Sequence, residues 1–432
     1  MRSECPSPQL LTPREGLITI NASHPIRAPW TLLPTHHRWL AAESERLLDF
    51  AAASVTRDGF GGLDVTGQLP PAAPTELWIT TRMTYVFTLA ALWGRPGASG
   101  LARHGLASLT GALHDDEHGG WFGSVDESGV LDDSKNAYDT AFVVLCSSAA
   151  LTAGLTGARA LLDEALDIID TRFWSSSDGL SADLSTADFS VLDPYRGANA
   201  NMHLTEAYLA AGDALGEELY RERALSIASR LIDGHARRHS WRLPEHYDQS
   251  WSPQPDYHLE EPRHARQPYG VTPGHLLEWS RLLLSLEHSL ATPPDWLLEA
   301  AVQLFDRGIA DGWDADQGGL VYTVDFQGAT VVADRLHWVA AEGIAAAATL
   351  ATRTGDPRFE EWYRRLWDWS ETHLVDREHG SWHHEVDVEG RPTSHTWPGK
   401  PDVYHPLQAT LAARLPLVGS FAHAVAGGLL RA

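Results

Sequence analysis

The sequence predicts an all-α protein, an (α/α)6 barrel in which six helical hairpins close into a toroid. A short turn rich in Asp, Gly and aromatic residues recurs at intervals of roughly 60 residues, one of them stretched to about 80, which is typical of stacked repeats. The segments between the turns carry apolar residues at helical spacing, without the alternation of strands. The turns begin at Asp58, His118, Asp178, His239, Gln317 and His379.

The apolar periodicity indicates twelve helices, two for each turn. In the first of them Leu40, Leu47 and Leu48 fall on one face. The expected helices cover residues 37–55, 80–93, 99–113, 136–154, 157–173, 200–213, 217–236, 273–290, 294–309, 334–353, 356–373 and 402–415. Six hairpins joined in one direction can close, which hides the apolar faces of an inner and an outer ring. Because neither end reads as a polar capping repeat, we favour closure over an open solenoid.

The repeat runs from end to end of the 432 residues, so we expect one catalytic domain over residues 1–432. One repeat is lengthened by a Pro- and aromatic-rich insertion at about 242–270, directly before the helix that carries His275. Long loops of this kind in compact domains are usually functional. The insertion is therefore expected to be a lid over the site.

Composition excludes several classes of protein. The formal net charge of −24 argues against nucleic-acid and anionic-membrane partners, which reward clustered Lys and Arg. Cys5 and Cys146 form neither a disulfide framework nor a thiolate metal site. The N-terminus lacks an apolar signal region, and the longest apolar stretch, 140–155, is too short to span a bilayer. We expect a soluble cytoplasmic protein, monomeric or homodimeric, that acts on a small molecule.

The six helices expected in the inner ring all begin with polar residues. Ser, Thr, Asn or Asp lies near every start, as suits a helix N-terminus. The inner helices of a closed toroid run roughly parallel, so all six first turns would face one pit. The residues expected around it are Arg82, Tyr138 or Asp139, His203, His275, His337 and His405.

Four histidines in one pit indicate proton transfer, because imidazole has an unperturbed pKa near neutrality. A lone histidine at a helix start is more often structural, but the joint occurrence is harder to explain that way. His203 and His275 are each followed three residues later by a carboxylate, Glu206 and Glu278, which shares the same helix face and could orient the ring. Metal binding could use the same groups, but no compact motif such as His-Glu-x-x-His is present, so neither a metal nor a cofactor is expected.

Four segments of this chain resemble the N-acylglucosamine 2-epimerase superfamily, and within it the branch of mannose isomerases and sulfoquinovose isomerases. The similarity runs across nearly the whole chain. The segments are Leu77-Trp-Ile-Thr-Thr-Arg82-Met, Asn199-Ala-Asn-Met-His203, Tyr269-Gly-Val-Thr-Pro-Gly-His275-Leu-Leu-Glu278-Trp and Trp397-Pro-Gly-Lys-Pro-Asp-Val-Tyr-His405. The resemblance implies an (α/α)6 barrel and a metal-free sugar isomerase or epimerase that moves protons between histidines.

The resemblance also implies roles for individual residues. His275 and His405 would be the acid/base pair, with Glu278 supporting His275, while His203 would help to polarise the sugar. Further expected substrate contacts are Trp78, a flat apolar platform one turn before Arg82, together with Arg82, Tyr138, Asp139, His337 and Trp338.

The activity that this set predicts is the interconversion of D-mannose and D-fructose. A near-neutral base removes the proton from C2 and returns it to C1 of a cis-enediol, while Arg82 stabilises the charge that builds on O1 and O2. A 2-epimerase of the N-acylglucosamine or cellobiose type would instead return the proton to the other face of C2. A sulfoquinovose isomerase would need extra donors, for which Lys400, Arg238 and Gln408 are available.

Two more distant alternatives stay open. An inverting glycoside hydrolase can use the same barrel with two carboxylates as acid and base, drawn from Asp139, Glu278, Glu342 and Asp402. A non-catalytic binding protein is disfavoured by the intact set of His and Arg positions.

Overall fold

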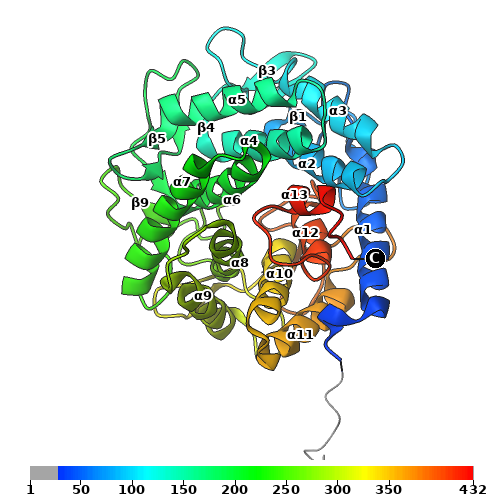
Figure 1. Cartoon of the computed structure of the whole chain (residues 1–432), viewed down its shortest axis with the longest axis vertical. Helices are drawn as coiled ribbons and strands as arrows, with labels where there is room; N and C mark the ends of the chain where they lie inside the picture. Colours follow the sequence, from blue (N-terminus) through cyan, green and yellow to red (C-terminus); the bar gives the residue numbers. More distant parts are fainter. Residues whose placement is uncertain (1–27, 432) are drawn as a thin grey trace, which may run out of the picture.

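The computed structural model describes residues 28–431, and these form a ring of helices (Figure 1). The twelve expected helices are present in this part of the chain, together with a short thirteenth that the apolar pattern did not indicate. The helices are α1 (Pro34–Ala51), α2 (Leu77–Leu92), α3 (Ala98–Leu109), α4 (Ala137–Thr152), α5 (Ala158–Ile168), α6 (Ala198–Leu215), α7 (Glu218–Ala228), α8 (Pro273–Ser289), α9 (Trp296–Gly312), α10 (His337–Thr354), α11 (Pro357–His373), α12 (Tyr404–Ala412) and α13 (Phe421–Ala426). Helices α5 and α7 continue as π-helical turns, Ile169–Phe173 and Ser229–Ala236.

The even-numbered helices form the inner ring and the odd-numbered ones from α1 to α11 the outer ring. Each inner helix packs against the outer helix that follows it, and α12 packs against α1 and α2, so the last hairpin meets the first (Figure 1). The inner helices are buried on nearly every side, as α2 and α4 illustrate, because the outer ring covers one face and the centre of the toroid the other. Helix α13 lies against α2, α4 and α6. The predicted closed (α/α)6 barrel is confirmed.

Short antiparallel strands, which the helical periodicity did not predict, join neighbouring repeats in the pairs β1–β2, β4–β7, β8–β9 and β12–β13 and form local hairpins in the others. They pair β1–β2–β3, β4–β7, β5–β6, β8–β9, β10–β11 and β12–β13. Their bounds are β1 (Thr75–Glu76), β2 (Ser124–Asp126), β3 (Gly129–Asp132), β4 (Lys135–Asn136), β5 (Trp174–Ser175), β6 (Leu180–Ser181), β7 (Leu184–Ser185), β8 (Arg196–Gly197), β9 (His246–Tyr247), β10 (Thr323–Val324), β11 (Thr330–Val332), β12 (Arg335–Leu336) and β13 (Glu385–Val386). Two 3-10 turns, Trp30–Leu32 and Ala52–Ser54, flank α1.

These strands place a carbonyl of the next repeat at the start of an inner helix. The first N–H of the helix donates to that carbonyl, which satisfies a group that would otherwise need a capping side chain. The bonds run from Leu77 to Gly123, from Ala137 to Asp183, from Ala198 to Glu245 and from His337 to His384, at 2.8–3.0 Å. Among the described inner helices, Asn136 of α4 is consequently the one N-cap residue whose side chain accepts a bond from its own helix. A bond from Lys400 N–H to the Leu63 carbonyl, 2.8 Å long, joins the sixth repeat to the first.

The recurring turns are tied to the inner helices by ion pairs, two of them buried and the third partly buried. In three repeats an Asp three residues before the first residue of the turn accepts the N–H groups two and three positions further on, and it also pairs with a cation just before an inner helix. The pairs are Asp115–Lys135 at 2.7 Å, Asp314–Arg335 at 2.5 Å and Asp376–Lys400 at 2.5 Å. The rhythm seen in the sequence therefore sets the position of the inner-helix starts. Lys400 is used in this way and is not a free donor for a sulfonate.

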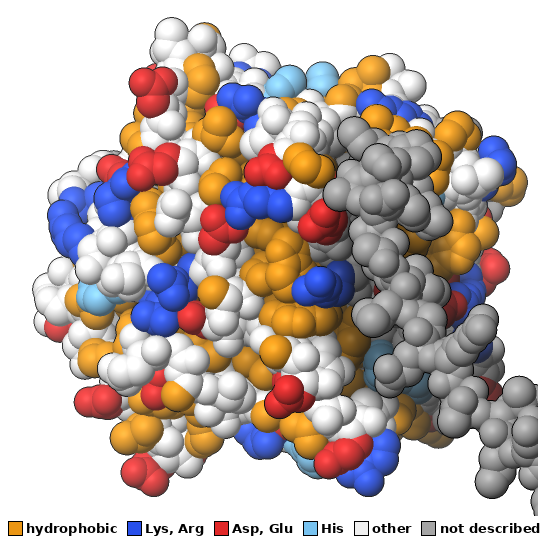
Figure 2. Space-filling view, turned by 90° about the horizontal axis from the view of Figure 1, so that it is seen from below, with side chains coloured by type: hydrophobic (Ala, Val, Ile, Leu, Met, Phe, Trp, Pro, Cys, Tyr) orange, Lys and Arg blue, Asp and Glu red, His pale blue; other side chains and the backbone are white. Residues whose placement is uncertain are grey.

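The insertion is ordered by its aromatic residues. Tyr257 lies against Tyr195 and His246, with ring centroids 5.1 and 4.7 Å apart, and His258 Nδ1 lies 2.7 Å from the Gln267 carbonyl. Over residues 28–431, no helix combines the length and apolar character needed to cross a membrane. Lys and Arg lie interspersed with Asp and Glu on the face that Figure 2 shows. Cys146 is buried, whereas Cys5 and the N-terminal segment lie outside the described residues.

Candidate active site

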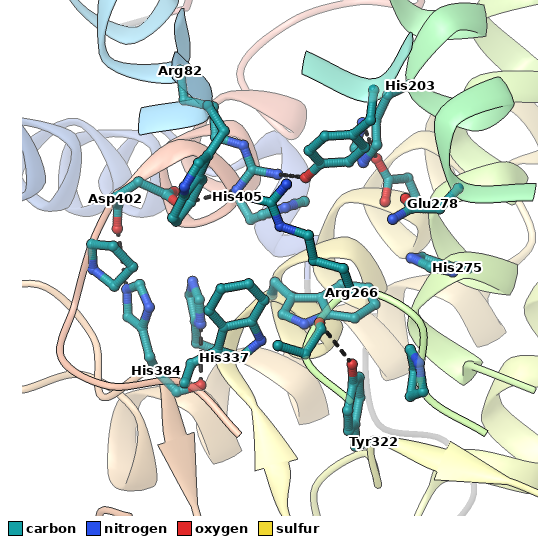
Figure 3. A pocket seen from close by; sticks show the side chains of 18 residues that line it. Arg82, His203, Arg266, His275, Glu278, Tyr322, His337, His384, Asp402 and His405 are labelled. Atoms are coloured by element: carbon teal, nitrogen blue, oxygen red, sulfur yellow. Dashed lines mark hydrogen bonds and ion pairs between the residues drawn. The ribbon is translucent and has the colours of Figure 1, made fainter. Parts of the chain in front are cut away.

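A pocket opens at the ends of the inner helices where they begin, and the insertion contributes to its wall. Figure 3 shows the side chains that converge on it. It is lined by Trp78, Arg82, Tyr138, Asn199, His203, Ala265, Arg266, Pro268, His275, Glu278, Tyr322, His337, Trp338, His384, Trp397, Pro401, Asp402 and His405. All of the predicted site residues are among them except Asp139. The Asp139 carboxylate accepts a bond from Asn136 Nδ2 at 2.6 Å and is not among the lining residues.

The side chains enter the pocket from different depths of the inner helices. Tyr138, His275 and His405 stand in the first turns of α4, α8 and α12. Arg82 and His203 are the sixth residues of α2 and α6, so the expectation of first-turn positions is wrong for these two. The two helices begin earlier than the sequence indicated because the strand pairs β1–β2 and β8–β9 place the carbonyls of Gly123 and Glu245 at their first N–H groups.

Arg82 is a fixed cation in the pocket wall. Its Nη1 donates to Asp402 Oδ2 at 3.0 Å and its Nη2 to the Tyr138 hydroxyl at 2.7 Å, while the guanidinium lies 4.6 Å from the centre of the Phe142 ring. Burial, the largest single influence, acts to raise the pKa of Asp402, but Arg82, His405, His337 and the Tyr404 N–H together outweigh it, and the pKa is lowered. The Asp402 carboxylate is therefore charged at neutral pH and holds the guanidinium in one orientation.

His275 is held by a glutamate that the sequence did not indicate. Its Nδ1 lies 3.0 Å from both carboxylate oxygens of Glu245, which is 4% exposed and belongs to the segment entering the insertion. The predicted support of His275 by Glu278 is therefore wrong as a direct contact. A shared helix face does not determine which carboxylate contacts His275. The Glu245 carbonyl accepts a bond from Ala198 N–H, and this places the Glu245 side chain beside the imidazole of His275.

His405 has an equivalent partner on a neighbouring inner helix. Its Nδ1 lies 2.8 Å from Glu342 Oε1, and the other oxygen of Glu342 accepts from Arg281 Nε at 3.2 Å. Burial first, and then the positive charge of Arg82, hold the pKa of His405 well below its usual range. The imidazole of His405 is therefore a neutral base at pH 7.

Beneath the pocket Arg281 lies among three glutamates, at 3.4 Å from Glu206, 3.8 Å from Glu278 and 3.2 Å from Glu342. Glu206 accepts from the Tyr404 hydroxyl and from Arg281, so the predicted pairing of His203 with Glu206 is wrong. Instead, His203 Nδ1 on α6 lies 3.8 Å from Glu278 Oε1 on the neighbouring inner helix α8.

Glu278 is a candidate neutral acid at the pocket surface. It is fully buried, and neither carboxylate oxygen has a hydrogen-bond partner among the described residues. Burial, and next the neighbouring charge of Glu342, raise its pKa well above the usual value. A protonated carboxyl can donate a hydrogen bond to a ligand oxygen, which a charged one cannot.

Aromatic rings separate and cover the polar groups. Trp338 lies between the two glutamate-held histidines, with ring centroids 5.1 Å from His275 and 5.8 Å from His405. Trp397 packs on Trp78 at 5.9 Å. Arg266, from the insertion, lies 5.9 Å from the Trp78 ring and reaches over the pocket as Figure 3 shows.

The sequence analysis assigned no role to five residues that line or support the pocket: Glu245, His384, Arg266, Asn199 and Trp397. Glu245 and His384 occupy equivalent positions of their repeats, because the carbonyl of each accepts the first N–H of an inner helix. This equivalent position in the repeat is the feature of the sequence from which both residues could have been predicted to lie near the pocket. By contrast, Arg238 and Gln408, considered as sulfonate donors, are not among the lining residues.

Three groups of carboxylates and histidines among the described residues are close enough together to bind a metal ion: one is Asp334 with Glu385 and His395, and the other two lie around Arg281. The latter two are His203 with Glu206 and Glu278, and Glu278 with Glu342 and His405. The guanidinium of Arg281 already lies within 3.8 Å of all three glutamates and supplies a positive charge there. The cluster therefore has its own cation among the described residues.

The family model for N-acylglucosamine 2-epimerase (GlcNAc 2-epimerase) matches residues 59–409 of this chain. The chain belongs to the N-acylglucosamine 2-epimerase family. The match covers the pocket from Trp78 to His405. The resemblance seen in four short segments is thereby confirmed over most of the sequence.

Within the N-acylglucosamine 2-epimerase family, the chain is similar to proteins named D-mannose isomerase. That of Thermobifida fusca is 49% identical over 92% of this chain and 98% of its own length. That of Pseudomonas cannabina pv. alisalensis is 47% identical over 92% of this chain and 97% of its own. A solved structure of a D-mannose isomerase superposes with a TM-score of 0.82 at 31% identity, over 87% of this chain and 97% of that one.

Proposed function

We propose that this chain is an aldose–ketose isomerase that interconverts D-mannose and D-fructose through a cis-enediol. One observation carries the proposal: His275 and His405 both line the pocket, and each has its Nδ1 held by a glutamate of another segment. A carboxylate acceptor keeps the proton on Nδ1 and leaves Nε2 as the basic nitrogen. The similarity to proteins named D-mannose isomerase supports the same reaction.

The aldose–ketose isomerisation uses two imidazole groups of this kind. One imidazole takes the proton from C2 of the open-chain aldose and returns it to C1, while the hydroxyl proton of O2 is lost and O1 gains one. The second imidazole can move the oxygen-bound protons and those of ring opening. Trp338 packs at a tilt against both rings and so supports the two imidazoles around one substrate.

The negative charge of the enediolate is met by groups already oriented in the free protein. Arg82 is fixed by Asp402 and Tyr138 at one wall, and Glu278 in its neutral form can donate a hydrogen bond from another. Groups that are oriented before the substrate binds need no rearrangement during the reaction, so they stabilise the charge as it forms.

A glycoside hydrolase would need two available carboxyl groups, which this site does not offer. Asp402 is bound by Arg82, Glu342 by His405 and Arg281, and Asp139 by Asn136 outside the lining. A 2-epimerase remains the second candidate, because a histidine on each side of an enediol can return the proton to either face of C2.

Incubation of the protein with D-mannose in D2O distinguishes these outcomes. We expect D-fructose carrying partial deuterium at C1, because the proton held by the imidazole exchanges with solvent before it is returned. The sugar is followed by NMR. D-glucose as the sole product would identify a 2-epimerase, and no reaction at all would remove both candidates.

The reaction is proposed to need no metal ion. Arg281 occupies the centre of the carboxylate cluster and provides its positive charge. We therefore expect full activity after dialysis against EDTA, measured as D-fructose formation. A loss of activity that added divalent metal restores would contradict this.

A further inference from the structure

His337 and His384 form a stacked pair at one side of the pocket, which we call the histidine pair. Their ring centroids are 3.7 Å apart and their planes 20° from parallel. His337 begins α10 and His384 lies directly before β13, so the pairing of β12 with β13 sets the stack. Figure 3 shows the pair next to Asp402, on the side of the pocket away from His275.

Backbone carbonyls determine the tautomer of each ring. His337 Nδ1 lies 3.2 Å from the His384 carbonyl, and His384 Nε2 lies 3.1 Å from the Asp402 carbonyl. A carbonyl oxygen can only accept, so both of these nitrogens carry the proton. The other nitrogens, His337 Nε2 and His384 Nδ1, are then bare hydrogen-bond acceptors.

Both rings stay uncharged at neutral pH. Each is 5% exposed, and burial lowers the pKa of His337 to about 4 and that of His384 well below the usual value. Protonation of one ring would also place a cation face to face with its partner. The two arginines of the pocket do not alter this uncharged state, because Arg82 is paired with Asp402 at 3.0 Å and Arg266 lies 4.0 Å from Asp139.

One of the two acceptors lacks a donor. His337 Nε2 is buried and has no hydrogen-bond partner within the described residues, although the ring lines the pocket. A buried polar atom without a partner is rare in folded proteins and calls for an explanation. A donor brought by the substrate explains it.

We propose that the histidine pair determines substrate specificity by accepting a hydrogen bond from a sugar hydroxyl away from the reacting carbons, and that it excludes phosphate and sulfonate at that position. An anionic group offers oxygens that only accept, so it would meet bare nitrogens with no proton between them. The inference rests on the proposed function of the same pocket. It narrows the substrate class to uncharged hexoses.

Deoxy and deoxyfluoro analogues of D-mannose test the direction of this hydrogen bond. Fluorine keeps the size and electronegativity of a hydroxyl but cannot donate. For one position among C3, C4 and C6, we expect the deoxy and deoxyfluoro sugars to lose kcat/KM equally, by about 100-fold, because the site is left with an unpaired acceptor. In His337→Phe, which retains a ring but no acceptor, the deoxy sugar should differ from mannose by less than about threefold.

Three further measurements separate specificity from a structural role. Ligand-free His337→Phe should melt near the wild type, since it removes an unsatisfied acceptor and the His384 carbonyl, which loses the bond from Nδ1, still accepts from the backbone N–H of residue 337. D-mannose phosphorylated at the position that the deoxy series identifies should have a kcat/KM at least about 100-fold below that of D-mannose. His288→Ala, at the exposed far end of α8, should leave the analogue pattern unchanged. Turnover of D-mannose by the wild type tests the proposed function separately. If there is no turnover, calorimetric affinities of the same analogues still test whether the histidine pair accepts a hydrogen bond from the sugar.

The proposal is overturned by any of three results. These are a deoxyfluoro sugar that matches mannose where the deoxy sugar fails, a deoxy penalty that His337→Phe leaves intact at every position, or a mannose phosphorylated at the sensitive position that is used as well as mannose.

Discussion

His405→Ala is expected to lower kcat for D-mannose by about a thousandfold, within the range that a positioned general base contributes. The imidazole is neutral because burial and Arg82 lower its pKa, and Glu342 holds its Nδ1 at 2.8 Å. Alanine removes the base and leaves Glu342 still paired with Arg281. Initial rates of D-fructose formation measure the loss, and far-ultraviolet circular dichroism establishes that the barrel is retained.

His288→Ala is the matched control, because this histidine is exposed near the end of α8, far from the pocket end of the same helix that carries His275. It should retain the wild-type rate. A His405→Ala protein that is folded and works within tenfold of the wild type would remove His405 from the proton-transfer role.

Glu245→Gln is expected to lower kcat by about a hundredfold while the folded state is retained, as replacing the carboxylate that orients a catalytic imidazole does elsewhere. Glu245 accepts from His275 Nδ1 with both oxygens at 3.0 Å. A glutamine can present its NH2 group instead, which favours the tautomer with the proton on Nε2. That nitrogen then cannot take a proton from the sugar.

The effect should fall on kcat more than on KM, since Glu245 is not among the residues that line the pocket. Glu261→Gln, an exposed glutamate of the same insertion, is the control and should be silent. If Glu245→Gln kept a rate within threefold of the wild type, the orientation of His275 would have to come from another group.

Much of the fold was predictable because the inner and outer helices bury long stripes of apolar residues. Those stripes leave a helical period in the sequence, and the turns between them repeat the same Asp and Gly residues. The second glycine of one turn, Gly319, has φ +80°, and a Cβ on it would lie 2.4 Å from Trp369. The turn therefore requires glycine at this position, and this requirement can be recognised in the sequence. The two-residue strands leave no such trace, because a period of two cannot be seen in so short a segment.

The site was predictable to the extent that its residues sit on helices. Arg82, His203, His275, His337 and His405 could be placed at one end of the barrel once its closure was inferred. Their partners could not be placed. Spacing along one helix suggested Glu206 for His203 and Glu278 for His275. In the structure, the carboxylate closest to each of these histidines comes from a different segment of the chain.

By itself, the sequence determined the all-α architecture, the number of hairpins and the set of histidines and arginine that converge on the pocket. Apolar periodicity and repeat spacing are local properties, and closure follows from them because it is the arrangement that buries both rings. Only the tertiary structure decided which glutamate orients which histidine, where Arg281 lies, and that His337 and His384 stack. Those contacts join residues of different repeats, and their distances depend on how the strands set neighbouring inner helices side by side.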